Sequence, residues 1–137
     1  MPIQMPKSDC SQPVCVVTGG AGFIGSHLVD RLLGLGHKVR VIDNLMGGNL
    51  SNLDQHDDHP GFSFHKLDVA DHQAISPVFD GAHWVFHLAA LADIVPSIND
   101  PLTYHRANVD GTASVLEASR RSGVLRFIYT ASSSCYG

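Results

Sequence analysis

The sequence predicts an α/β protein in which helices cover both faces of a doubly wound parallel sheet. Three observations lead to this prediction: short apolar runs alternate with helical segments, a glycine-rich turn joins the first run to the first helix, and the connections are long. Parallel strands require such long, right-handed crossovers. The expected strand order is 3-2-1-4-5, which leaves a ligand crevice between the first and fourth strands, where the order reverses.

The strands are predicted from short segments whose apolar residues are continuous or alternate with polar ones. The first, VCVVT, is continuously apolar and precedes two glycines, as is typical of a buried parallel strand. The second, KVRVID, alternates valine with a basic residue. The others are FSFHKL, AHWVFHL and RFIYT. The five predicted strands cover residues 14–18, 38–43, 62–67, 82–88 and 126–130.

The first helix begins near Phe23, where the spacing of apolar residues becomes helical. Gly34 or Gly36 can end this helix in a left-handed cap, because glycine has no Cβ. Residues 44–61 combine three glycines with aspartate, histidine and proline. This segment therefore predicts a loop that holds at most a helical turn.

The second half of the chain is expected to hold two further helices. Asp71 caps a short one that Pro77 interrupts, because proline lacks the N–H that a helix interior needs. Asp100 and Pro101 start a longer helix, with aspartate at the N-cap and proline at the first helical position, and Gly123 stops it after about residue 122. The expected apolar stripe of this helix contains Val109, Ala113 and Leu116.

The composition indicates one globular domain. The chain has 137 residues, 44% of them hydrophobic, and a net charge of −4, which argues against nucleic acid as the main partner. It has neither an apolar run long enough for a membrane span nor a secretory signal. Three cysteines without CxxC spacing indicate free thiols, so the expected location is cytoplasmic. We expect residues 1–13 to form a flexible leader and residues 14–137 to form the domain.

The turn between the first strand and the first helix, TGGAGFIG at residues 18–25, is the strongest candidate site. Its glycines let the backbone turn tightly and approach a pyrophosphate, while the helix N-terminus offers free N–H groups and a partial positive charge. Asp43 ends the next strand 18 residues after Gly25, close to the spacing of the dinucleotide-binding fingerprint. A tight turn without a ligand is the alternative, and the strand–turn–helix context favours the dinucleotide.

Asp43 is predicted to select the coenzyme. Its carboxylate can accept hydrogen bonds from both hydroxyls of an adenosine ribose, and its charge would face the 2′-phosphate of NADP. Two unit charges about 4 Å apart repel by about 4 kcal/mol at an effective dielectric constant of about 20, which is an upper bound. The sequence therefore predicts NAD as the cofactor. The alternative is that Asp43 only caps the loop at the strand end.

Six short motifs occur in the same order as in one enzyme family. They are Thr18-Gly19-x-x-Gly22-x-x-Gly25, Asp43-Asn44, Leu67-Asp68-Val69, His87-Leu88-Ala89-Ala90, Asn108-Val109-x-Gly111-Thr112 and Ser132-Ser133-Ser134-x-Tyr136-Gly137. With these motifs, residues 14–137 resemble the N-terminal portion of the extended short-chain dehydrogenases/reductases. Within that group they resemble the NAD-dependent nucleotide-sugar epimerases and dehydratases, UDP-glucose 4-epimerase above all. The resemblance implies a Rossmann fold that binds NAD.

The resemblance also implies which residues meet the cofactor. The residues beside its pyrophosphate would be Gly19, Gly22, Phe23, Ile24 and Gly25. Those at the adenosine ribose and the adenine edge would be Asp43, Asn44, Asp68 and Val69. Those beneath the nicotinamide half would be Leu88, Ala89 and Ala90. Asn108 would fix the active-site backbone from its helix.

The same resemblance assigns Ser132 to the reacting sugar hydroxyl, with Ser133 and Ser134 as close alternatives. The family's Tyr-x-x-x-Lys motif, which carries the catalytic base, does not occur in the 137 residues. We therefore expect an incomplete Rossmann domain that stops before the last strands and the sugar-binding lobe and is inactive alone. The implied parent reaction is hydride transfer from a nucleotide sugar, expected to be a UDP-sugar, to NAD, with a tyrosinate as base.

Among the reactions of this family, 4-epimerisation of a UDP-hexose is the preferred prediction. UDP-glucuronate decarboxylases and sugar 4,6-dehydratases need acidic partners near the reactive carbons, either beside the serine or past residue 137, and neither Ser133 nor Ser134 supplies one beside Ser132. A non-catalytic, NAD-sensing module is the alternative from another class. The resemblance is compatible with a homodimer. The segment QHDDH at residues 55–59 lacks metal-site spacing and is interpreted as a solvated loop, so no metal is expected.

Overall fold

The computed structural model describes residues 12–136 and contains a five-stranded sheet in which all neighbouring strands are parallel. The order β3-β2-β1-β4-β5 confirms the prediction. Val17 of β1 lies opposite Val41 of β2 on one side and Phe86 of β4 on the other. Of the predicted leader, residues 1–11 lie outside the described residues. The strands are β1 (Val14–Thr18), β2 (Lys38–Asp43), β3 (Phe62–Lys66), β4 (Trp84–His87) and β5 (Arg126–Tyr129).

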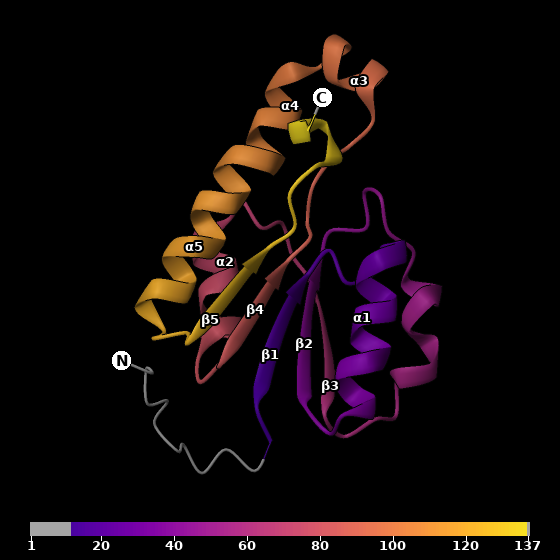
Figure 1. The fold of residues 1–137 in the computed structure, drawn as a ribbon, viewed down its shortest axis with the longest axis vertical. Helices are drawn as coiled ribbons and strands as arrows, with labels where there is room; N and C mark the ends of the chain where they lie inside the picture. Colours follow the sequence, from indigo (N-terminus) through magenta and orange to yellow (C-terminus); the bar gives the residue numbers. More distant parts are fainter. Residues whose placement is uncertain (1–11, 137) are drawn as a thin grey trace.

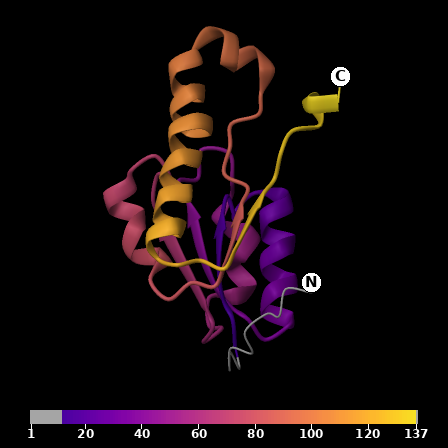
Figure 2. The same ribbon diagram turned by 60° about the vertical axis from the view of Figure 1, so that its left-hand side comes forward.

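Helices cover both faces of this sheet, which gives the three layers of a Rossmann fold (Figures 1 and 2). Gly36 follows the first helix in the left-handed conformation, with φ +82°, as the sequence predicts. Asp71 caps the short helix by accepting a hydrogen bond from the N–H of Ala74. The helices on one face are α1 (Phe23–Gly34) and the 3₁₀ helix η1 (Leu50–His56); those on the other are α2 (His72–Ile75), the 3₁₀ helix η2 (Ser76–Phe79) and α5 (Gly111–Arg121).

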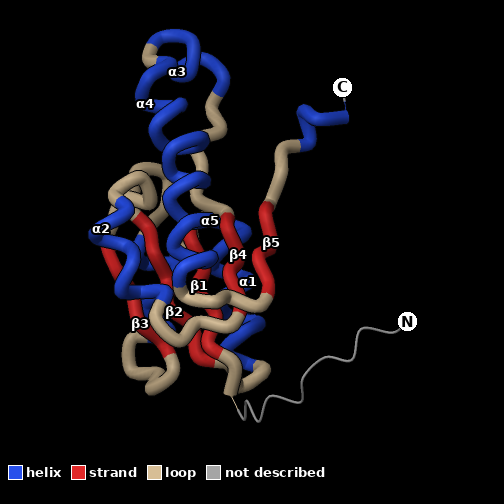
Figure 3. The backbone as a smooth tube through the Cα atoms, turned by 90° about the vertical axis from the view of Figure 1, so that its left-hand side faces the viewer, coloured by secondary structure: helices blue, strands red, loops and turns tan. Residues whose placement is uncertain are grey.

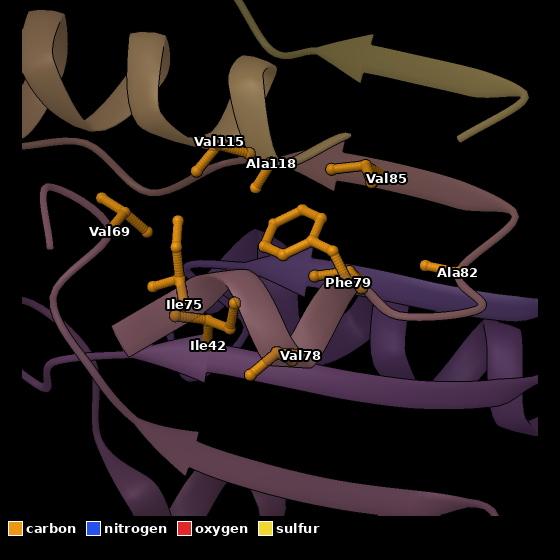
Figure 4. Close-up of a cluster of buried hydrophobic side chains, with 10 residues drawn as sticks. Ile42, Val69, Ile75, Val78, Phe79, Ala82, Val85, Val115 and Ala118 are labelled. Atoms are coloured by element: carbon orange, nitrogen blue, oxygen red, sulfur yellow. The ribbon is translucent and has the colours of Figure 1, made fainter. Parts of the chain in front are cut away.

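Successive side chains of the central strands point to opposite faces, so the sheet separates two apolar cores. The core beneath α2 and α5 receives Val16 from β1 and Ile42 from β2, and Figure 4 shows Ile42 beside Ile75, with Val115 and Ala118 on the opposite side of the cluster. The core beneath α1 is formed by the intervening strand positions, by three residues of α1, and by Ala21 and Leu53. Its members include Cys15, Val17, Val39, Val41, Val29, Leu32 and Leu33. Because both faces are buried, the strands fix the position of the loops at their ends.

The long helix predicted from Asp100 onward is divided into three segments. The helix α4 (Pro101–His105) is joined to α5 by one π-helical turn, η3 (Arg106–Asp110), and Asp100 caps α4 by accepting from the N–H of Thr103. A further helix, α3 (Ile94–Asn99), precedes them and was not predicted. Figure 3 shows α3 and α4 extending beyond the end of the sheet.

The predicted apolar stripe of this long helix is wrong. Val109, Ala113 and Leu116 are exposed. A Cβ on Gly111 would lie 2.7 Å from Cγ2 of Val69, so the helix runs too close to the sheet side for large side chains at this point. Close packing therefore selects a small residue at Gly111, while the larger Val115 is buried one turn further along. The buried residues of α5 are Gly111, Ser114, Val115, Ala118 and Ser119.

Candidate functional site

A pocket opens at the carboxyl ends of β1, β2 and β4, where the strand order reverses, as expected for a doubly wound sheet. The loops that follow the first four strands form its walls. Nine of the residues assigned to the cofactor line it: Gly19, Gly22, Asp43, Asn44, Asp68, Val69, Leu88, Ala89 and Ala90. Four residues of that assignment are outside the lining, namely Phe23, Ile24, Gly25 and Asn108.

The glycine turn is packed so closely that two of its positions exclude any side chain. Gly19 has φ +70°, and a Cβ there would lie 2.7 Å from the backbone nitrogen of Ala89. A Cβ on Gly25 would collide with the carbonyl oxygen of Gly19. These two glycines are thus required by the folded chain itself, whether or not a ligand is present.

Gly22 is different, because the protein around it does not require a glycine. Its φ of −76° and ψ of 177° are open to any residue. The nearest atom to a Cβ at this position would be the Gly19 carbonyl oxygen at 3.4 Å, an ordinary contact. Gly22 nevertheless lines the pocket at the start of α1. The missing side chain leaves a cradle in which a ligand can approach the backbone, and this fits a dinucleotide.

The N-terminus of α1 supplies hydrogen-bond donors at this cradle. The first bond within the helix is donated by Ser26 to the carbonyl of Gly22, so the N–H groups of Phe23, Ile24 and Gly25 precede the helical ladder. No acidic side chain lies in the first turn, and no side chain caps it. Although the side chains of Phe23 and Ile24 are 80% and 63% exposed, their backbone donors suit an anion such as pyrophosphate.

Asp43 is buried at the end of β2 and holds two backbone segments together. Its Oδ2 accepts from the N–H of Ala21 at 3.0 Å, and its Oδ1 accepts from the N–H of Leu45 at 2.8 Å. Leu45 has φ +65°, a conformation that is rare for leucine. The carboxylate therefore caps the loop, which was the alternative interpretation. Because each oxygen keeps a further lone pair, the predicted contact with ribose hydroxyls stays compatible with this geometry.

Two polar contacts shape the side of the pocket formed by η3. Arg106 donates to Oδ2 of Asp68 at 3.1 Å, while Oδ1 of Asp68 accepts from the N–H of Ala70. Asn108 clamps the backbone of Leu91 in both directions: its amide donates to the Leu91 carbonyl at 2.9 Å and its oxygen accepts from the Leu91 N–H at 2.8 Å. Asn108 thus fixes the segment after β4 from behind rather than lining the pocket.

His87 lies at the end of β4 with only 2% of its surface exposed, and both ring nitrogens have partners. Nδ1 is 2.6 Å from the hydroxyl of Thr18, and Nε2 is 2.9 Å from the hydroxyl of Thr112. The Thr18 oxygen also accepts from the N–H groups of Leu88 and Ala89. Burial lowers the pKa of His87 to about 4, so the imidazole is neutral at physiological pH.

Ser132, the predicted catalytic residue, lies apart from the pocket lining. It is exposed in the segment after β5, where its hydroxyl donates to the Ser134 hydroxyl at 3.0 Å and accepts from the Ser134 N–H at 3.1 Å. Ser133 begins the short 3₁₀ helix η4 (Ser133–Tyr136). Figure 3 shows this segment leading away from the sheet. The structure brings together nine of the residues assigned to the cofactor, and it leaves the serines outside that group.

Six lining residues were not assigned from the sequence, and three of them come from the loop after β2. Asn49 donates to the carbonyl of Ala21 through its backbone N–H, and Asn52 does so through its side chain, which holds this loop against the glycine turn. The sequence signal for these residues was the pair Gly47-Gly48, because adjacent glycines allow this loop to approach the backbone of the glycine turn closely. The six residues are Met46, Gly47, Gly48, Leu67, Leu91 and Ala107.

The described part of the chain has neither the side-chain cluster of a metal centre nor a membrane-spanning helix. Within residues 12–136, no group of three or more His, Cys, Asp or Glu side chains is arranged to hold a metal ion. His56, from the histidine-rich loop, contacts Oδ1 of Asp30, and His59 accepts from the N–H of Gly61. None of the helices in this range is long and apolar enough to cross a membrane.

The buried His87 predicts a pH-dependent stability. Its pKa is about 4 in the folded chain and about 6.5 in an unfolded one, so below pH 6.5 the unfolded state binds a proton that the folded state does not. This contribution is fully present above pH 6.5 and is lost as the pH falls towards 4, by about 3 kcal/mol in total.

The measurement is urea denaturation of the wild type and of His87→Gln between pH 7 and pH 4. The difference in unfolding free energy between the two should shrink by about 3 kcal/mol over this range, because only the wild type carries the imidazole. Among the described residues whose rings contact His87, the titratable one is Tyr129. Its ring stacks on that of His87 with 6.0 Å between the centroids, and it is present in both proteins. A difference that stays constant with pH would contradict the assignment.

Comparison with known proteins agrees with this geometry. The chain is 39% identical over 122 residues to UDP-glucuronic acid decarboxylase 4 of Arabidopsis thaliana, which covers 89% of this chain and 26% of the decarboxylase. The structure of UDP-N-acetylglucosamine 4-epimerase from Methanobrevibacter ruminantium, in complex with UDP-N-acetylmuramic acid, matches with a TM-score of 0.84 and 37% identity over 92% of this chain and 40% of that one.

A third comparison concerns a structure that contains the coenzyme. UDP-glucose 4-epimerase of Thermus thermophilus, in complex with NAD, matches with a TM-score of 0.72 and 36% identity, over 83% of this chain and 36% of that one. The chain thus spans well under half the length of these three proteins. The family model described as "NAD dependent epimerase/dehydratase family" matches residues 15–137, and this chain belongs to that family.

Proposed function

We propose that the pocket binds NAD and that this chain is the NAD-binding part of a nucleotide-sugar epimerase/dehydratase of the UDP-hexose 4-epimerase type. The single observation that carries the proposal concerns Gly22. This residue lines the pocket, although the surrounding protein would accommodate a side chain at its position. The pyrophosphate would lie against Gly22 and the N–H donors of α1, and the adenosine ribose would lie against Asp43. Bound NAD would supply a hydride acceptor for transient oxidation of the sugar.

The family resemblance assigns the sugar chemistry of the proposed reaction to the residues after β5. Ser132 would hydrogen-bond the reacting hydroxyl of a UDP-sugar. UDP-glucuronate decarboxylation is a second candidate, favoured by the 39% identity to the Arabidopsis enzyme. Ser133 and Ser134 provide no acid beside Ser132, so an acid for decarboxylation would have to come from beyond residue 137. A homodimer and a cytoplasmic location stay predictions, from the resemblance and from the cysteine content.

The first prediction is selectivity for NADH over NADPH by at least tenfold, because the Asp43 carboxylate would repel a 2′-phosphate. Asp43→Asn removes the charge and keeps one acceptor oxygen, so it should bring the two affinities to within about threefold. Fluorescence titration with each reduced coenzyme measures this. Asp68→Asn is the matched control, since it removes a carboxylate from the same pocket. Asp68→Asn should leave the ratio of NADH affinity to NADPH affinity unchanged. If this ratio is the same in both variants, Asp43 is excluded as the residue that selects the coenzyme.

The second prediction tests the cradle at Gly22. Gly22→Ala adds one methyl group that the protein accommodates and that would occupy the place of the pyrophosphate. NADH affinity should fall at least tenfold, while the circular dichroism spectrum is unchanged. Gly34→Ala adds the same group to the same helix with no atom within 4 Å and should bind NADH as the wild type does. If both variants bind alike, the phosphate does not lie at Gly22.

The third prediction is that the 137 residues bind NAD without interconverting UDP-glucose and UDP-galactose. They contain Ser132 but no Tyr-x-x-x-Lys, and a general base typically contributes about 10²- to 10⁴-fold in rate. A coupled assay of the two sugars, with NADH binding measured on the same sample, separates binding from turnover. Turnover by these residues, abolished in Ser132→Ala, would contradict the requirement for that motif.

A further inference from the structure

His87 joins three parts of the pocket wall that are far apart in the sequence. Thr18, on its Nδ1 side, directly precedes Gly19 of the glycine turn. Leu88 and Ala89 directly follow His87, and both donate their N–H groups to the Thr18 hydroxyl at 3.2 Å. On its Nε2 side, the Thr112 hydroxyl connects the ring to the helix that bears Asn108. One buried imidazole thus lies between the turn, the segment after β4 and the helical wall.

The hydrogen bonds of this network can run in one direction only. The Thr112 hydroxyl donates to the carbonyl of Asn108 at 2.6 Å, so its oxygen has to accept from Nε2–H of His87. Nδ1 then carries no proton and accepts from the Thr18 hydroxyl. This leaves the Thr18 oxygen free to accept from the two backbone N–H groups. Every polar group of the network is satisfied when the imidazole is neutral and protonated on Nε2.

The pocket walls that this network connects are packed closely against each other. The backbone of Gly19 lies so close to that of Ala89 that even a methyl group would not fit between them. Leu88, Ala89, Ala90 and Leu91 all line the pocket. Thr18 and His87 hold the first two of these residues, and Asn108 holds the last. A change of the His87 hydrogen bonds would therefore move a whole wall of the pocket relative to the glycine turn.

We propose that His87 is a positioning residue for the coenzyme: its Nε2-protonated imidazole sets the separation between the glycine turn and the segment Leu88–Leu91, and with it the width of the pocket. The inference rests on the proposed NAD site. His87 itself is absent from the pocket lining, so it acts through the residues that it holds. The ligand recognised is a dinucleotide that spans both walls.

The first test is the affinity of the 137-residue chain for NAD, measured by isothermal titration calorimetry at pH 7.5 where each protein is folded. His87→Phe keeps a ring of similar size without nitrogens and should weaken binding at least tenfold. Phe79→Leu is the matched control, because Phe79 is fully buried in the core beneath α2 and α5 and lies outside the pocket lining. It should destabilise the fold while its NAD affinity stays within twofold of the wild type.

Two further measurements distinguish positioning from a general loss of stability. Thr112→Val removes the partner of Nε2 without changing the size of the side chain, and it should also weaken NAD binding. Combined with His87→Phe it should add less than threefold to the effect of His87→Phe alone, because both changes break one network. The ¹⁵N spectrum of the histidines should identify one ring as protonated on Nε2 only, and its signals should vanish in His87→Phe.

The outcomes separate this inference from the proposed function. A wild-type chain that does not bind NAD overturns both. A wild type that binds NAD, with His87→Phe folded and equal in affinity, overturns the positioning role and leaves the NAD site intact. A His87 ring protonated on Nδ1, or fully multiplicative effects of His87→Phe and Thr112→Val, also overturns the role. Weak binding confined to the network variants, with the control unaffected, supports it.

Discussion

The close approach of the turn after β1 to the segment after β4 is the constraint on which the rest of the site depends. Gly19 and Gly25 lack side chains because backbone atoms already occupy the space that a Cβ would need. This contact occurs where the strand order reverses, so the two loops separate beyond it and leave a pocket. The same turn aims the N-terminus of α1 at that pocket. In the proposed site, backbone geometry, more than any charged side chain, would thus attract the anionic pyrophosphate.

Holding these loops in place requires polar groups inside an apolar sheet. Thr18, Asp43 and His87 are all buried at the ends of central strands, and each uses its side chain to bind backbone N–H groups or other hydroxyls. A buried polar group without a partner costs about 1–3 kcal/mol, so each of these residues is tolerated only because its partners are fixed. The loops and the strand ends consequently stabilise one another.

The sequence predicts the parts of the structure that follow from periodicity and from glycine. Strand positions, the turn and the caps at Asp71 and Asp100 are confirmed because they depend on local patterns, and the strand order is confirmed because it follows from the alternation of strands and helices. The inner face of the helix formed by η3 and α5 was predicted wrongly, since Gly111 and Ser114 are buried there while the larger Val109 and Leu116 are exposed. The π-helical turn and α3 carry no local signal of that kind. The pocket residues contributed by the loop after β2 depend on contacts with Ala21 that are distant in sequence.

The separation of Ser132 from the pocket has a consequence for the way one fold serves several reactions. The pocket is lined by residues between Gly19 and Ala107, whereas Ser132 lies exposed beyond β5. A decarboxylase and an epimerase are almost equally similar to this chain, with 39% and 37% sequence identity. If the proposed NAD site is correct, the residues around the pocket would be constrained by a step that enzymes with different sugar chemistry have in common. Differences between the reactions would then arise where the sugar is held, which the proposal places beside Ser132.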